Sequence, residues 1–232
     1  MTLVRTESRT LILTEVARRI ATLPRTCPQL VAIDGVDGAG KTTFADELVD
    51  ALAGCGRMVV RASIDSFHNP KAVRYLRGNA SPEGYYRDSF NLDAVKTMLL
   101  DPLKRGSGAM FRRAAFDEPS DQPVEAPAEQ VKADMLLLFD GVFTHRPELR
   151  GYWDFTVLLE AADRAHAEWL AYLHRDLPDG RREGEEEIER RRKVSRRGRY
   201  VDGQALYFAE ATPMVYADVI VDNNDLSNPI IL

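Results

Sequence analysis

The chain has 232 residues, of which 44% are hydrophobic and 29% are charged, with 31 basic against 36 acidic side chains. That length suits one α/β domain, and the hydrophobic fraction is enough for a packed core. The formal net charge of -5 gives no overall attraction to nucleic acid or to an anionic membrane, so any phosphate site has to be local.

Neither export nor membrane insertion is indicated. The first ten residues mix charged and polar side chains and lack the apolar stretch of a secretory signal. No apolar run reaches the roughly 18 residues that a membrane-spanning helix needs. Cys27 and Cys55 form no CxxC pair, and we assign them no chemistry. We therefore expect a cytoplasmic protein that binds a small molecule, with no nucleic-acid or membrane partner; homo-oligomer formation is left open.

The N-terminal part of the chain predicts a helix, a strand, a glycine-rich loop and a second helix. Apolar residues near helical spacing predict the first helix over residues 11–23, ahead of two prolines. The short apolar run at 30–34 predicts a strand. After the glycines, Phe44, Leu48 and Leu52 form the apolar face of a helix. The glycine-rich loop is therefore expected to join a strand to a helix.

Residues 35–42, GVDGAGKT, match the phosphate-loop pattern G-x-x-x-x-G-K-[ST]. Glycines let the backbone turn tightly, so that consecutive N–H groups point at an anion beside the positive end of the helix dipole. Lys41 is expected to reach the β- and γ-phosphates, and the Thr42 hydroxyl to join a magnesium shell. The strand before and the helix after favour this reading over an ordinary glycine turn, so Mg-ATP is the expected cofactor. The residues expected to bind it are Gly35, Asp37, Gly38, Ala39, Gly40, Lys41, Thr42 and Thr43.

The rest of the chain alternates between predicted strands and helices. Helical stretches are expected at 94–100, 161–174 and 203–211. This alternation predicts an α/β fold, a three-layer P-loop NTPase sandwich with a parallel central sheet and helices on both faces, in one domain over residues 1–232. The further strands are predicted at 58–64, 110–115, 135–140, 155–160 and 217–222.

Two long stretches interrupt the alternation. Residues 66–90 are rich in Asn, Gly, Pro, Tyr and Arg, and residues 177–200 carry mixed charge. Long insertions in compact α/β domains usually serve as binding loops or lids, so we expect the first to bind the acceptor and the second to be a lid. Within the second, Glu and Arg residues four apart predict a solvent-facing helix over 185–193.

Acidic residues are predicted at the carboxyl ends of two strands. Asp65 follows the strand 58–64, and Asp140 ends the strand 135–140. Ligands of open parallel sheets bind at this edge, so both carboxylates are expected near the phosphate loop. Phosphoryl transfer to a hydroxyl needs one acid to take the proton and another to hold magnesium. The alternative for each is an ordinary turn aspartate.

Several segments resemble the uridine kinase / phosphoribulokinase family of P-loop kinases. Residues 65–70, DSFHNP, are similar to the family's Asp-Ser-Phe-Tyr or Asp-Ser-Phe-His after the second strand, and residues 139–143, FDGVF, resemble its Glu-Gly-Ile-Leu. Residues 174–176, HRD, resemble its Arg-Asp, and residues 216–220, YADVI, its Tyr-Ala-Asp-Val-Ile strand. With the phosphate loop, the resemblance covers roughly residues 28–222 in the family's order.

The resemblance implies ATP-dependent phosphorylation of a hydroxyl on a nucleoside such as uridine or cytidine, or on a related sugar-bearing alcohol. It implies Asp65 as the base and Thr42 with Asp140 as magnesium contacts, although Asp140 is shorter than the family's Glu. The implied catalytic residues are Asp65, Lys41 and the lid arginines Arg197 and Arg199, which suit a phosphoryl group because guanidinium binds phosphate in a fork. The implied acceptor contacts are His68, Tyr86, Asp88, Arg175 and Gln204.

Two other functions stay open at this point. Residues 34–43, DGVDGAGKTT, also resemble the loop of thymidylate kinases, but no Arg-Glu-Pro follows the second strand and no Asp-Arg-Tyr follows the third. A nucleotide-binding protein that transfers no phosphate is the other alternative, because phosphate loops also occur in switches and degenerate kinases.

Overall fold

The computed structural model of the chain describes residues 6–161 and 199–232. Apart from its first residue, the helix expected at 161–174 lies outside these ranges, as do the charged helix at 185–193, Arg175 and Arg197. Six strands form the central sheet in the order β10-β9-β8-β1-β7-β2. The sheet strands are β1 (Gln29–Gly35), β2 (Met58–Ser63), β7 (Met135–Asp140), β8 (Phe155–Glu160), β9 (Val219–Asp222) and β10 (Ile230–Ile231).

The predicted parallel sheet is confirmed for five of these strands, and β10 runs antiparallel to β9. Every residue of β1 and β7 is buried, as expected for central strands covered on both faces. Side chains alternate between the two faces along β7: Leu137 and Phe139 join one apolar cluster, and Leu136 and Leu138 join the other. The fold is therefore a three-layer α/β sandwich.

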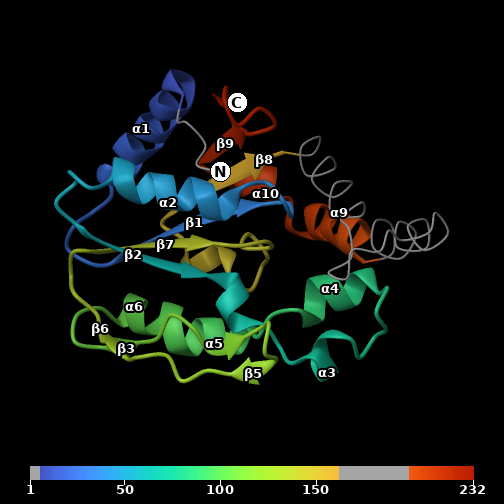
Figure 1. The fold of residues 1–232 in the computed structure, drawn as a ribbon. Coiled ribbons are helices and arrows are strands. Elements are labelled where there is room, and N and C mark those ends of the chain that lie inside the picture. Colours follow the sequence, from blue (N-terminus) through green and yellow to red (C-terminus); the bar gives the residue numbers. More distant parts are fainter. Residues whose placement is uncertain (1–5, 162–198) are drawn as a thin grey trace, which may run out of the picture.

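One face of the sheet is covered by α1 (Glu7–Ala21) and α2 (Lys41–Ala51) (Figure 1). The helix α1 begins four residues before the predicted start, because the Thr6 hydroxyl caps it by accepting a hydrogen bond from Arg9 N at 3.2 Å. Phe44 and Leu48 of α2 are fully buried against the sheet. This packing fixes the first turn of α2, and so the phosphate loop, on the carboxyl end of β1.

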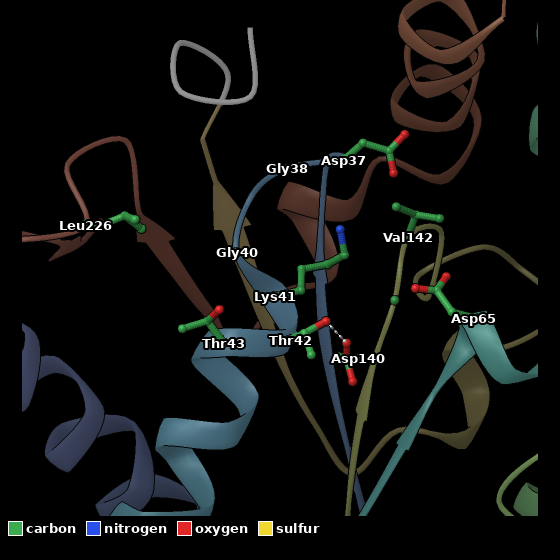
Figure 2. A pocket seen from close by; sticks show the side chains of 11 residues that line it. Asp37, Gly38, Gly40, Lys41, Thr42, Thr43, Asp65, Asp140, Val142 and Leu226 are labelled. Atoms are coloured by element: carbon green, nitrogen blue, oxygen red, sulfur yellow. Dashed lines mark hydrogen bonds between the residues drawn. The ribbon is translucent and has the colours of Figure 1, made fainter. Parts of the chain in front are cut away.

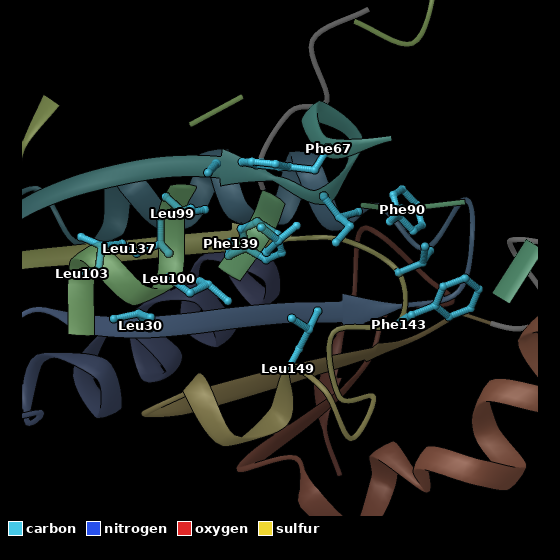
Figure 3. Packing of buried hydrophobic residues seen from close by; sticks show 14 of the residues in the cluster. Leu30, Phe67, Phe90, Leu99, Leu100, Leu103, Leu137, Phe139, Phe143 and Leu149 are labelled. Carbon is cyan, nitrogen blue, oxygen red and sulfur yellow. The ribbon is translucent and has the colours of Figure 1, made fainter. Parts of the chain in front are cut away.

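Aromatic and aliphatic side chains pack together on the other face. Phe139 of β7, Phe67, Phe90 and Phe143 belong to one buried cluster (Figure 3).

Among residues 6–161 and 199–232, no helix combines the length and apolar character that crossing a bilayer requires. The remaining helical segments are η1 (Ile64–Phe67), α3 (Lys71–Arg74), α4 (Pro82–Asp88), α5 (Leu92–Ala94), the π-helical turn η2 (Val95–Leu100), α6 (Asp101–Arg105), η3 (Arg150–Tyr152), α9 (Tyr200–Ala211) and α10 (Pro213–Tyr216).

The strand predicted at 110–115 is not part of the central sheet. Only β3 (Met110–Phe111) is extended there, and it pairs antiparallel with β6 (Glu129–Gln130). Beyond it the backbone is bonded elsewhere, with Arg112 N donating to Met98 O at 2.8 Å and Ala115 N to Ser66 O at 2.9 Å. A second small ribbon follows, formed by β4 (Phe116–Asp117) and β5 (Gln122–Pro123). The second ribbon forms one border of the candidate site, through Phe116 and Asp117 of β4.

Candidate active site

The phosphate loop lies between β1 and α2, at the carboxyl end of the sheet (Figure 2). Gly38 and Gly40 have φ angles of 74° and 81°, which residues with a Cβ adopt only with strain. Gly40 caps α2, and Phe44 N donates to its carbonyl at 2.9 Å. The free N–H groups of the first turn, together with the helix dipole, therefore point at the space beside the loop.

That space is a cavity of about 430 Å³. Lys41, at the start of α2, and Asp65, in η1, both line it (Figure 2). The Nζ atom of Lys41 donates to Val36 O of the loop itself at 2.8 Å, so the ammonium group is held over the cradle. The lining residues are Asp37, Gly38, Gly40, Lys41, Thr42, Thr43, Asp65, Asp140, Gly141, Val142 and Leu226.

Two of the residues expected to bind ATP do not line this cavity. Gly35 ends β1, where a Cβ would lie 2.6 Å from Leu159 O, so its role in the described structure is close packing between two strands. Ala39 is fully buried, and its N–H donates to Val36 O at 3.1 Å within the loop. Sequence reasoning missed Leu226, which comes from the loop after β9 and carries no motif.

Gly141 allows the two strand-end acids to share the cavity. A Cβ at Gly141 would lie 2.3 Å from Cγ2 of Ile64, so a larger residue would push the end of β7 away from η1. Asp140 directly precedes Gly141 in the sequence, and Asp65 directly follows Ile64. The close approach therefore places both carboxylates beside the phosphate loop, Asp140 at the end of β7 and Asp65 in η1, just after the neighbouring strand β2.

The residues around Asp140 fit a magnesium ion held mainly by phosphate. The Thr42 hydroxyl donates to Asp140 Oδ2 at 2.8 Å, and Nη1 of Arg61 lies 2.9 Å from Oδ1. A hydroxyl and a carboxylate are the hard oxygen ligands that Mg²⁺ takes beside the phosphates of a nucleotide. Within the described residues no cluster of three or more His, Cys, Asp or Glu side chains could hold a metal by itself.

A second cavity, of about 460 Å³, lies on the other side of Asp65. Six of its lining residues come from the stretch 66–90, which the sequence singled out as an insertion. The sequence did not indicate Phe116 or Glu118, because they lie in and beside a short ribbon with no pattern of its own. The lining residues are Asp65, Ser66, His68, Arg74, Tyr75, Tyr85, Ser89, Phe116, Asp117, Glu118, Pro119, Arg199 and Tyr200.

Among the expected acceptor contacts, His68 lines the second cavity, where its Nδ1 lies 2.8 Å from Asp65 O. Tyr86 is instead a core residue, only 1% exposed, because its ring packs edge-on against Phe143. Asp88 forms an ion pair with Arg77 at 2.7 Å and lines neither cavity. The structure thus brings His68 to the site and leaves Tyr86 and Asp88 outside it.

Gln204 and Asp37 contact each other across the site. Gln204 Nε2 donates to Asp37 Oδ2 at 2.8 Å, and the Tyr85 hydroxyl donates to the same oxygen at 2.5 Å. The phosphate loop is therefore tied to α9 and to α4. Arg199, expected to close over the transferred phosphoryl group, lines the second cavity and not the one beside the loop.

A buried polar network behind the loop has no counterpart in the sequence analysis. Asp34 is fully buried, and its Oδ2 accepts hydrogen bonds from the Tyr207 hydroxyl and from His145, whose Nδ1 lies 2.7 Å away. Burial alone would raise the pKa of Asp34, but His145 and Tyr207 hold it below its ordinary value. The network joins β1 to α9, and its only signal in the sequence is an acid inside an apolar strand.

Burial in the concave site raises the pKa of Asp65, although its side chain is open to solvent in the cavities. His68 and Lys41 oppose this rise, and the negative charges of Asp140 and Asp37 add to it. A carboxylate with a raised pKa is a better proton acceptor at neutral pH than an ordinary aspartate.

The raised pKa predicts how activity depends on pH. If Asp65 takes the proton of the acceptor hydroxyl, only its ionised form is active, so kcat/KM should fall as the pH drops through a pKa above the ordinary 3.8. Steady-state rates across the acidic range, with ATP saturating, measure this decrease in kcat/KM. The residual activity of Asp65→Asn should not show the decrease. The same decrease in that variant would assign the titration to another group.

Comparisons with known proteins agree with this geometry. The sequence profile described as the Phosphoribulokinase / Uridine kinase family matches residues 30–204. A uridine kinase of Leuconostoc citreum is 25% identical over 158 residues, which cover 66% of this chain and 70% of that protein. A thymidylate kinase of Xanthomonas oryzae is 30% identical over 127 residues, but the match covers only 48% of this chain and 55% of that enzyme.

Solved structures show the same fold. A structure described as a possible uridine kinase from Bacillus stearothermophilus has a TM-score of 0.66 at 22% identity, covering 90% of this chain and 96% of that one. A putative fructose transport system kinase from Silicibacter sp. TM1040 has a TM-score of 0.64 at 21% identity, covering 86% and 95%. At such identities the likeness concerns the fold and not the substrate.

Proposed function

The chain belongs to the phosphoribulokinase/uridine kinase family, and from this premise we propose that it transfers the γ-phosphoryl group of ATP to a hydroxyl of a nucleoside or related sugar-bearing alcohol. The observation that carries the proposal is the position of Asp65. Its carboxylate lines both the cavity beside the phosphate loop and the second cavity, so it faces a nucleotide on one side and an acceptor on the other.

In this proposal the loop cavity holds the triphosphate. The N–H groups at the start of α2 and the Lys41 ammonium lie where negative charge accumulates on the transferred group. Thr42 and Asp140 would hold Mg²⁺, which when bound neutralises phosphate charge and orients the nucleotide. Asp65 orients the acceptor hydroxyl and takes its proton as the acceptor oxygen bonds to the γ-phosphorus and the bond from that phosphorus to the bridging oxygen of the leaving ADP breaks.

The second cavity suits a small acceptor. Its volume lies in the range of small-ligand pockets, and Tyr75, Tyr85 and Phe116 contribute aromatic side chains to its wall. His68, near the start of the stretch 66–90, supplies a polar side chain next to the proposed base Asp65. These features support a sugar-bearing acceptor, and the 25% identity to a uridine kinase makes uridine the first one to test.

Release of ADP from Mg-ATP tests the proposal. We expect at least one acceptor in a panel of uridine, cytidine, pantothenate and ribulose 5-phosphate to raise the rate above the acceptor-free background. The Asp65→Asn variant should keep only a small residual part of that acceptor-dependent rate. A preference for dTMP would instead favour a thymidylate-type kinase, and background rates with every acceptor would favour a nucleotide-binding protein without transfer.

A further inference from the structure

Two buried arginines form part of the wall of the second cavity. Arg199 precedes α9 and is 4% exposed, and Arg74 ends α3 and is 5% exposed. They contact each other, because Nη2 of Arg199 donates to the backbone carbonyl of Arg74 at 3.2 Å. A buried guanidinium group is unusual, since burial of a charge is unfavourable unless a partner compensates it.

Part of the hydrogen-bonding capacity of Arg199 is unused. Its Nε and Nη1 have no hydrogen-bond acceptor in residues 6–161 and 199–232. Its guanidinium lies instead over aromatic faces, 4.5 Å from the centroid of the Tyr75 ring and 5.8 Å from that of Tyr85. The rings hold the group in place and leave donor nitrogens for a ligand.

Arg74 is only partly satisfied as well. Its two terminal nitrogens pair with Glu118 at 2.7 Å and with Asp121 at 3.3 Å, whereas its Nε has no acceptor in the described part of the chain. Glu118 is thereby committed to Arg74 and does not compensate Arg199. Three donor nitrogens on two buried cations therefore remain for an acceptor that the described residues do not supply.

The other acids of the cavity do not neutralise Arg199 either. Asp117 is turned to Ser120, whose N–H donates to its Oδ2 at 3.1 Å. Asp65 lies at the border with the loop cavity, beside His68. The cavity thus has a negative charge at the proposed base and, at Arg199, a positive charge with no acidic partner in the described part of the chain, whereas the charge of Arg74 is balanced by Glu118 and Asp121.

We propose that the acceptor carries an anionic oxygen group, a phosphate or a carboxylate, which binds Arg199 and Arg74 while its hydroxyl faces Asp65. This inference rests on the proposed function for the hydroxyl, but the anion site itself does not require transfer. Charge-assisted hydrogen bonds from buried arginine to such a group are among the strongest polar contacts in proteins. Sugar phosphates and sugar acids are then preferred over neutral sugars and nucleosides.

Calorimetric titration tests the site without turnover. The loop cavity is first saturated with Mg²⁺ and a non-hydrolysable ATP analogue, because the phosphate loop would otherwise bind anions. Two matched pairs are then titrated, ribose 5-phosphate against ribose and gluconate against glucitol. We expect an anionic member to bind about tenfold to a hundredfold more tightly than its neutral partner, as hydrogen bonds to charged groups predict. A difference between ribose 5-phosphate and ribose identifies a phosphate site, and a difference between gluconate and glucitol identifies a carboxylate site.

Variants locate the effect. Arg199→Met should remove most of the preference for the anion, and Arg199→Lys should keep part of it, since it retains the charge but loses the planar group. Arg105→Met, at an exposed position in α6, is the matched control and should keep the full preference. Unchanged affinity for the ATP analogue in each variant shows that the fold is intact.

Equal affinity for the two members of both pairs in the wild-type protein would overturn the inference, as would no binding of either anion. A full preference that survives in Arg199→Met would overturn it too. If the anion binds but no acceptor is phosphorylated, the proposed function fails and the anion site stands. If a neutral nucleoside is phosphorylated and no anion is preferred, the proposed function stands and the anion site fails.

Discussion

Asp65→Asn is expected to lower kcat by about 10²- to 10⁴-fold, the range that a positioned general base contributes. The amide has the shape of the carboxylate but cannot take the acceptor proton. Because Asp65 borders both cavities and forms no ion pair within residues 6–161 and 199–232, the fold and the affinity for Mg-ATP should stay near those of the wild type. Single-turnover phosphoryl transfer and nucleotide titration measure the two quantities separately.

Asp134→Asn is the matched control for this change. Asp134 is exposed and precedes the amino end of β7, at the edge of the sheet opposite to the site, so the variant should retain wild-type turnover. Wild-type turnover in Asp65→Asn would remove Asp65 as the base. Loss of Mg-ATP binding together with turnover would instead make Asp65 a structural support of the nucleotide cavity.

Lys41→Met is expected to lower kcat/KM for ATP by about 10²- to 10³-fold, as the removal of one charge-stabilising donor from a preorganised site does. Methionine keeps most of the apolar stem and removes the ammonium group that Val36 O holds over the cradle. We expect part of the loss in kcat, because negative charge on the transferred oxygens develops further in the transition state.

Lys132→Met serves as its control. Lys132 is exposed and lies just before β7, away from both cavities, so its replacement should change neither kcat nor KM. Steady-state kinetics with ATP varied at saturating acceptor compare the two variants. An unchanged kcat/KM in Lys41→Met would mean that the ammonium group does not contact the triphosphate.

The parts of the site that local pattern could predict are those carried by one continuous segment. The phosphate loop is such a segment: strand, glycines, lysine and helix follow one another, and the positive φ angles of Gly38 and Gly40 are what the spacing requires. Asp65 and Asp140 were also located correctly at strand ends, because parallel strands bring their carboxyl ends to one edge. Their roles stay predictions until the variants are measured.

The acceptor side could not be predicted in the same way. Tyr85 and Tyr86 are adjacent in the sequence, yet Tyr85 lines the second cavity and Tyr86 is buried against Phe143, and only the rotation of α4 in its packing against α9 decides between them. Asp88 was expected at the acceptor and pairs with Arg77 instead. Side-chain direction in a short helix follows its packing, which composition does not reveal.

The sequence by itself determined the α/β class, the phosphate cradle and the edge of the sheet at which the acids lie, because these depend on contacts between near neighbours and on strand direction. The tertiary structure decided which residues meet across the fold. Arg199 lies against Arg74, 125 positions away, and Asp34 accepts from Tyr207, 173 positions away. Such pairs form only when separate layers pack, so no local periodicity encodes them.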